Sequence, residues 1–175
     1  PGNYCVIFDR QGAILGGYRK SHPTVPEQKL GMVPGDKLTV FTLDCMRIGI
    51  MTCMDIEYPE VAMALMLQGA ELLAFPHVQG SWGDIEWEIR YRARAIDTGL
   101  FLVSSSYGYE EGDWMPGKMT GRSGIVGKDG TILAEMGHRI GTLTMDLDPM
   151  QKRITPFFFN QKLDRTPAVC ASRRP

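Results

Sequence analysis

The chain has 175 residues, the usual length of one domain, and 43% of them are apolar, which is enough to build a hydrophobic core. Its 19 Lys and Arg nearly balance its 20 Asp and Glu, so it lacks the basic surface that attracts nucleic acids and anionic membranes. No apolar run approaches the roughly 18 residues of a spanning helix, and the first residues lack a signal-peptide pattern. We expect a cytoplasmic protein with no nucleic-acid or membrane partner.

The first part of the chain is predicted to form a hairpin followed by a loop. Residues 3–9 and 13–19 are rich in β-forming side chains and are separated by a turn signal at 10–12. Lys20 ends this hairpin. Residues 21–36 contain three prolines and two glycines and show no sustained period, which predicts a loop of the kind that often carries functional residues.

The next segment is predicted to place a cysteine between a strand and a helix. Residues 37–43 and 46–52 have strand composition, and Cys53 follows the second run directly. A helix is expected from Pro59, a residue suited to a first turn, to Gly69, a residue suited to a C-terminal cap.

The rest of the chain is predicted to continue with alternating strands and helices. A buried strand is expected over 71–78, a helix over 84–98, and β-structure in three later runs at residues 100–108, 122–136 and 139–148. The turn signal at 128–130 predicts a hairpin. Strands and helices that alternate in the middle, with hairpins at both ends, predict an α/β fold with a sheet of mixed direction. We expect one domain over 1–150 and a tail over 151–175 that is a candidate interface.

The position of Cys53 suggests a nucleophile. At the start of a helix, the aligned peptide dipoles stabilise a thiolate, and the backbone N–H of Met54 can face a developing oxyanion. Such a site performs acyl transfer. The alternative is a small buried thiol with a structural role, which is common for free cysteines. The local pattern leaves both interpretations open.

Two motifs, one around Lys20 and one around Cys53, carry a family resemblance. Residues 18–22, YRKSH, and residues 49–60, GIMTCMDIEYPE, resemble the YRKxHL and GxxxCYDxxFPE patterns of the nitrilase superfamily of carbon–nitrogen hydrolases. Residues 34–36, 92–99 and 121–135 resemble further motifs of the superfamily, and the resemblance covers the chain to about residue 150. It implies an α-β-β-α sandwich and chemistry by a Glu-Lys-Cys triad.

This resemblance implies roles for two residues. Cys53 would be the nucleophile that forms a thioester, and Lys20 the cation that stabilises the tetrahedral intermediate. The sequence Cys53-Met54-Asp55 is similar to the C-Y-D of amidases and carbamoyl hydrolases, whereas nitrilases carry C-W-E. We therefore expect a small-molecule amide or N-carbamoyl substrate, release of ammonia or an amine, and no cofactor.

Other residues receive supporting roles, each with a structural alternative. Glu27 would hydrogen-bond the lysine or else be a solvated loop charge, and His22 would support the lysine or else be structural. Tyr58 and Trp82 are assigned to substrate binding, although Trp82 would serve equally as an anchor for the following helix. His77 and His138 are assigned to structural roles.

The resemblance fails at one point. The general-base glutamate of the superfamily precedes its YRK motif and has no counterpart here, so the chain resembles the C-terminal two thirds of a family member. We expect the 175 residues alone to be inactive. The alternative is a non-catalytic fragment or interaction subunit of the same fold.

Other kinds of site are less well supported. Cys53, Asp55 and His77 lack the paired spacing of a metal site, and no histidine stands in the context of a Cys-His hydrolase. Superfamily members commonly dimerise through the helices beside the nucleophile, here 59–69 and 84–98, so a homo-oligomer is expected.

Overall fold

The computed structural model describes residues 1–44, 46–78, 84–108, 121–148 and 150–151. Its main sheet has six strands in the order β3 (Val40–Thr42), β4 (Arg47–Ile50), β5 (Leu72–Pro76), β6 (Phe101–Ser105), β7 (Gly124–Val126) and β8 (Ile132–Glu135). β4, β5 and β6 are parallel, and the outer strands pair antiparallel. A separate antiparallel hairpin is formed by β1 (Tyr4–Phe8) and β2 (Ile14–Arg19).

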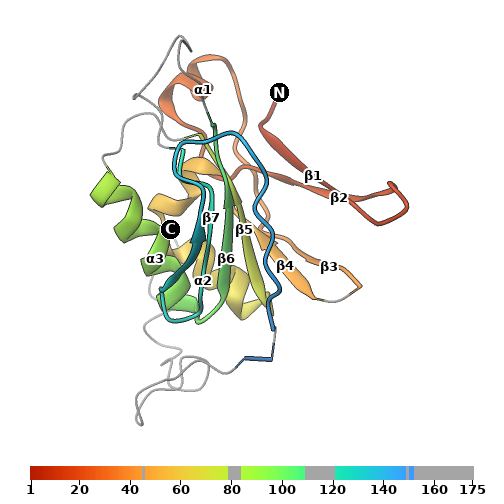
Figure 1. The fold of residues 1–175 in the computed structure, drawn as a ribbon. Helices are drawn as coiled ribbons and strands as arrows, with labels where there is room; N and C mark the ends of the chain where they lie inside the picture. The colour runs from red at the N-terminus through yellow and green to blue at the C-terminus, as the bar shows by residue number, and fades with distance from the viewer. Residues whose placement is uncertain (45, 79–83, 109–120, 149, 152–175) are drawn as a thin grey trace, which may run out of the picture.

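Two helices cover one face of the six-stranded sheet (Figure 1). α2 (Pro59–Leu67) contacts β4, and α3 (Asp84–Thr98) contacts β6 and β7. The β1–β2 hairpin lies away from these helices, on the other side of the sheet (Figure 1). A short helix, α1 (Val25–Lys29), and a 3-10 turn, η1 (Cys53–Glu57), complete the described elements.

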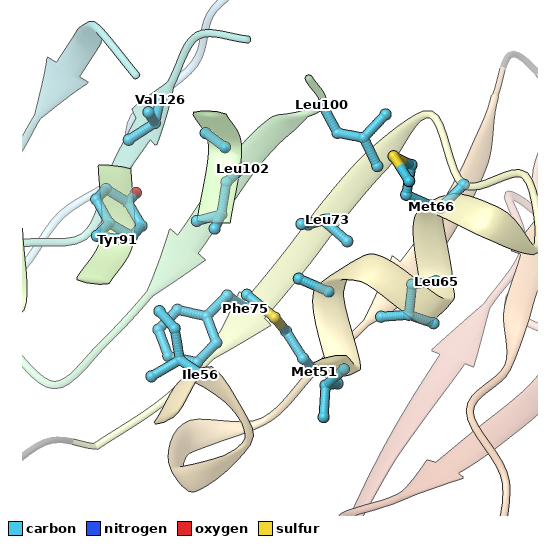
Figure 2. Packing of buried hydrophobic residues seen from close by; sticks show 14 of the residues in the cluster. Met51, Ile56, Leu65, Met66, Leu73, Phe75, Tyr91, Leu100, Leu102 and Val126 are labelled. Carbon is cyan, nitrogen blue, oxygen red and sulfur yellow. The ribbon is translucent and has the colours of Figure 1, made fainter. Parts of the chain in front are cut away.

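The hydrophobic core lies between the helices and the sheet (Figure 2). Leu73 and Phe75 of β5 point towards it, as alternate residues of one strand must, and meet Leu65 of α2 and Tyr91 of α3. The central strands β5 and β6 carry nearly continuous apolar runs, and most of their residues are buried. Among the described residues, no helix is both long enough and apolar enough to span a membrane.

Most predicted elements are present, including the opening hairpin, the helix over 84–98 and the hairpin around 128–130. Two predictions are wrong. Residues 21–36 are not all loop, because they contain α1, and residues 139–148 alternate like a strand but form none. Alternation alone makes no strand, since a strand also needs a neighbour for its backbone hydrogen bonds. The predicted tail beyond Gln151 lies outside the described residues.

Candidate active site

A buried ion pair forms one side of the site. Lys20 directly follows β2, and its side chain is only 2% exposed. Its Nζ lies 2.7 Å from Oε2 of Glu27, on α1. A buried ammonium is stable only when it is paired, so the position of Lys20 depends on this carboxylate.

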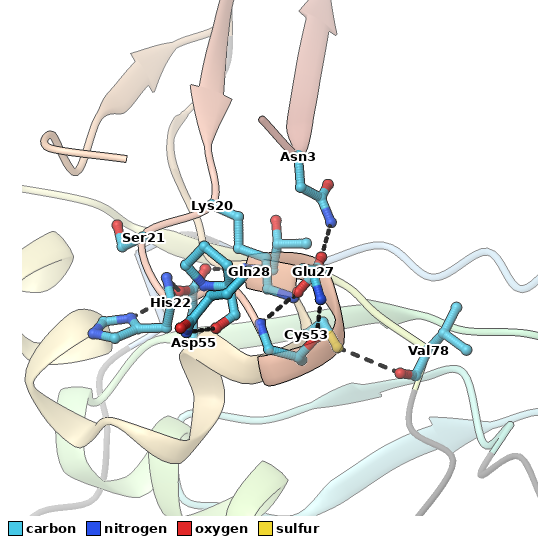
Figure 3. Close-up of polar contacts among 12 residues, drawn as sticks. Asn3, Lys20, Ser21, His22, Glu27, Gln28, Cys53, Asp55 and Val78 are labelled. Carbon is cyan, nitrogen blue, oxygen red and sulfur yellow. Dashed lines mark hydrogen bonds and ion pairs between the residues drawn. The ribbon is translucent and has the colours of Figure 1, made fainter. Parts of the chain in front are cut away.

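Glu27 is fixed by three donors (Figure 3). Besides Lys20, Nδ2 of Asn3 donates to Oε1 at 2.7 Å, and the backbone N–H of Thr24 donates to Oε2 at 2.6 Å. Thr24 and Glu27 form a capping box, which explains why a short helix starts in a Pro-rich segment. Partial burial acts to raise the pKa of Glu27, but the hydrogen bonds from Lys20, Asn3 and Thr24 outweigh it and lower the pKa to about 2. The carboxylate is therefore ionised at neutral pH.

Cys53 occupies a strained turn three residues after the end of β4. Its φ of 49° lies in the left-handed region, which costs a non-glycine residue about 1–2 kcal/mol. The thiol is half-buried, and Sγ lies 3.3 Å from the carbonyl oxygen of Val78. The predicted position at a helix start needs correction, because Cys53 opens the five-residue turn η1 and α2 begins only at Pro59. The strained turn, rather than the dipole of α2, sets the presentation of the thiol.

Asp55 joins the cysteine segment to the lysine segment. Its fully buried carboxylate accepts hydrogen bonds from the backbone N–H of Thr52 at 2.8 Å and from the Tyr18 hydroxyl at 2.8 Å. The backbone N–H of His22 donates to it at 3.1 Å, and Nδ1 of the same histidine lies 2.9 Å away. Because Tyr18 and His22 flank Lys20, this one carboxylate fixes Lys20 relative to Cys53.

The motif at 34–36 packs against the same strand end. The backbone N–H of Gly35 donates to the carbonyl of Lys20 at 2.8 Å. A Cβ at Gly35 would lie 2.0 Å from the carbonyl oxygen of Arg19, so only glycine permits this approach. The motif therefore holds the backbone that carries the lysine.

The motif at 92–99 supports the turn η1 from the helix side. Nε of Arg94 donates to the carbonyl of Ile56 at 3.0 Å, and the side chain is further paired with Asp97. Arg94 is 6% exposed, so this contact joins α3 to the cysteine turn within the interior.

A single cavity of about 620 Å³ brings Lys20, Glu27 and Cys53 together. It lies at the carboxyl ends of β4, β5 and β6, where it is also lined by His77, Ser105 and Tyr107. Figure 3 shows Glu27 between Asn3 and Lys20, with Cys53 beside them. A cysteine beside a buried ammonium is suited to attack on a carbonyl carbon whose oxygen develops negative charge.

Two other predicted site residues lie elsewhere. His22 contacts Asp55 rather than Lys20, and its ring stacks on Tyr58 with centroids 3.8 Å apart. Tyr58 is 39% exposed and is not among the described residues that line the cavity. Met54 lies on η1, directly after the cysteine, and its oxyanion role stays a prediction. Trp82 falls outside the described residues.

Sequence reasoning gave no site role to Asp55, Asn3, Thr24 or His77. For Asp55 a signal was present, because it lies two residues after Cys53 in the same motif, and a carboxylate so close to a buried strand needs donors. Thr24 and Glu27 carry the spacing of a capping box. Nothing local to Asn3 or His77 indicates their place at the cavity.

Comparison with known sequences supports this description. The sequence pattern of the carbon–nitrogen hydrolase family matches residues 1–154. The chloroplastic omega-amidase of Arabidopsis thaliana is 31% identical over 156 residues, which are 83% of this chain and 42% of that protein. Nitrilase homolog 2 of Dictyostelium discoideum is 30% identical over 155 residues, with 83% and 47% covered. The chain thus spans about half the length of these relatives.

Solved structures give the same result. A mutant amidase from Nesterenkonia sp. AN1, with acrylamide added at its active-site cysteine, superposes with a TM-score of 0.79 at 27% identity. This match covers 97% of our chain and 62% of that one. A carbon–nitrogen hydrolase from Helicobacter pylori G27 gives a TM-score of 0.67 at 31% identity, with 79% and 53% covered.

Proposed function

Because the chain belongs to the nitrilase superfamily of carbon–nitrogen hydrolases and has its fold, we propose that it carries the nucleophile and the cation of an amidase. The substrate would be a small amide or N-carbamoyl compound. The observation that carries this proposal is the single cavity that holds Cys53 beside the buried Lys20–Glu27 pair. The amidases among the similar proteins support the amide class.

The proposed reaction has two halves. The thiol of Cys53 gives up its proton as the sulfur attacks the carbonyl carbon, and the ammonium of Lys20 stabilises the oxyanion that forms. The C–N bond then breaks as the leaving nitrogen takes up a proton, so ammonia or an amine departs and a thioester remains. Water attacks the thioester, the C–S bond breaks, and the acid leaves as the thiol regains a proton.

Proton transfer needs a base, and Glu27 is a poor candidate for it. Among the described residues that line the cavity, Glu27 is the only carboxylate, and its pKa of about 2 makes it a weak proton acceptor. We therefore assign Glu27 to holding Lys20. We therefore expect that the 175 residues alone do not turn over an amide.

Ammonia release tests the proposal. The 175-residue chain and the complete natural reading frame that contains it are each incubated with omega-amides, carbamoyl amino acids and nitriles. We expect release from amide or carbamoyl substrates by the complete protein, and none after Cys53→Ala. If the complete protein releases ammonia from none of them, or if Cys53→Ala keeps the activity, the proposal is wrong and a non-catalytic interaction subunit becomes the better interpretation.

Thiol alkylation provides a test that does not depend on turnover. We expect iodoacetamide to modify Cys53 faster than Cys5, because burial raises the pKa of the Cys5 thiol. Peptide mass mapping at short times measures both rates in the same sample. Equal or slower labelling of Cys53 would contradict a nucleophilic role.

We also propose that the chain self-associates through the outer side of α3. Ile85, Ile89 and Ile96 recur at helical spacing on this side and are 78%, 63% and 38% exposed. A row of exposed isoleucines on one helix marks an interaction surface.

A further inference from the structure

A buried histidine at the cavity is not used by the proposed reaction. His77 directly follows β5, and its backbone N–H donates to the carbonyl of Ser105 at 2.9 Å. The residue is 5% exposed and lines the cavity that contains Cys53. Its ring stacks on Phe75, with centroids 4.4 Å apart and planes inclined by 13°. This stack and the backbone bond fix the imidazole in one place.

Among the residues that the structure describes, neither ring nitrogen of His77 has a hydrogen-bond partner. Buried polar side-chain atoms are nearly always paired, and an unpaired one needs an explanation. Burial lowers the pKa of His77 to about 4, so the ring is neutral at pH 7 and offers one donor and one acceptor. A ligand in the cavity that carries a donor or an acceptor would satisfy these atoms.

The charges around the cavity restrict the ligand. Among the described lining residues, only Lys20 and Glu27 carry full charge at neutral pH, and they neutralise one another. The remaining polar groups include the hydroxyls of Ser105 and Tyr107. A carboxylate on the ligand would therefore be desolvated without a free cation, whereas a hydroxyl or an amide would not.

We propose that His77 determines substrate specificity by hydrogen-bonding an uncharged polar group on the acyl part of the substrate. The site then prefers amides whose acyl chain ends in a hydroxyl or a second amide over amides that end in a methyl or a carboxylate. This inference rests on the proposed amidase function and narrows its substrate class.

Two pairs of nearly isosteric amides test this preference with the complete natural protein. 3-Hydroxypropionamide differs from butyramide by a hydroxyl in place of a methyl, and succinamide differs from succinamate by an amide in place of a carboxylate. We expect kcat/KM to be about tenfold higher for the first member of each pair, the size of one buried neutral hydrogen bond.

The variants His77→Phe and His77→Asn separate a polar from a purely structural role. Phenylalanine keeps a ring against Phe75 but lacks both nitrogens, so the kcat/KM ratio for the hydroxyl pair should fall to about one. Asparagine keeps a donor and an acceptor and should retain part of the preference. A ratio that is unchanged in His77→Phe would overturn the inference.

A spectroscopic measurement keeps the inference testable if no amide is hydrolysed. In Cys53→Ala protein with ¹⁵N-labelled histidine, the His77 ring signals are assigned by their loss in the double variant with His77→Phe. We expect 3-hydroxypropionamide to shift these signals and butyramide to leave them unchanged. Shifts without hydrolysis would refute the amidase function and support the His77 site, whereas hydrolysis without any such shift would do the reverse.

Discussion

The ammonium of Lys20 lies 2.7 Å from the carboxylate of Glu27, and both side chains are largely withdrawn from water. The pair joins the end of β2 to α1, so a loop segment and a strand end are held together next to Cys53. Removing one charge would leave the other withdrawn from water without an opposite charge, which is far more costly than replacing both. A substitution that removes only one of the two charges should therefore strongly destabilise the fold around Cys53.

This pair predicts a pH-dependent stability. The folded-state pKa of Glu27, about 2, lies below its ordinary value of 4.5, so its contribution is present above about pH 4.5 and is lost as the pH falls towards 2. The shift corresponds to about 3 kcal/mol. Urea unfolding between pH 6 and pH 2.5 should show a steeper loss of unfolding free energy for the wild type than for Glu27→Gln. Asp146→Asn, at an exposed carboxylate, should follow the wild type. Parallel curves for wild type and Glu27→Gln would contradict the assignment.

Asp55 should matter for both stability and activity. Asp55→Asn puts an amide where the four contacts with Thr52, Tyr18 and His22 require an acceptor, so we expect a loss of about 2–3 kcal/mol in the free energy of unfolding. Because Lys20 is then no longer held in place relative to Cys53, alkylation of Cys53 should also slow. Asp36→Asn is the matched control, since its 3.4 Å contact with Arg19 is largely exposed and is worth little. Equal effects of the two variants would argue against a positioning role for Asp55.

The parts of the site that could be predicted from sequence are those set by local pattern. Lys20 and Cys53 each end a strand-like run, so their places follow from strand boundaries alone. The capping box at Thr24 and Glu27 is also local, but the surrounding prolines conceal a five-residue helix. Asp55 shows the limit of such reasoning, because Tyr18 and His22 lie 37 and 33 positions upstream of it. Long-range hydrogen bonds of this kind leave no periodic signal.

The segment 139–148 shows a different limit. Its alternation satisfies the pattern of a strand, and its backbone is described, yet it joins neither sheet. The alternation of apolar side chains indicates which face of a strand would be buried. The strand itself forms only when a neighbouring strand pairs with its backbone through hydrogen bonds. At His77 the structure forms a site that no local pattern indicates, because its surroundings come from β5, β6 and the cysteine turn together.

The backbone strain at Cys53 predicts a difference between two inactive variants. Cys53→Gly removes the cost of a positive φ, whereas Cys53→Ala retains it, so glycine should be more stable by about 1 kcal/mol despite its greater unfolded-state entropy. Thermal and urea unfolding of both variants measure this difference, and neither should release ammonia. An alanine variant as stable as glycine or more so would mean that the turn relaxes without the thiol.

The isoleucines on the outer side of α3 predict concentration-dependent assembly. Ile89→Lys places a charge in the middle of this row, where burial in an interface would leave it unpaired, so the variant should be mostly monomeric when the wild type is dimeric or larger. Leu30→Lys is the control, because Leu30 is 73% exposed but lies at the end of α1 rather than on α3. Sedimentation velocity over a hundredfold range of concentration distinguishes the two. A wild type that stays monomeric throughout, or an Ile89→Lys variant that assembles as the wild type does, would remove α3 as the interface, and the exposed isoleucines would then need another partner.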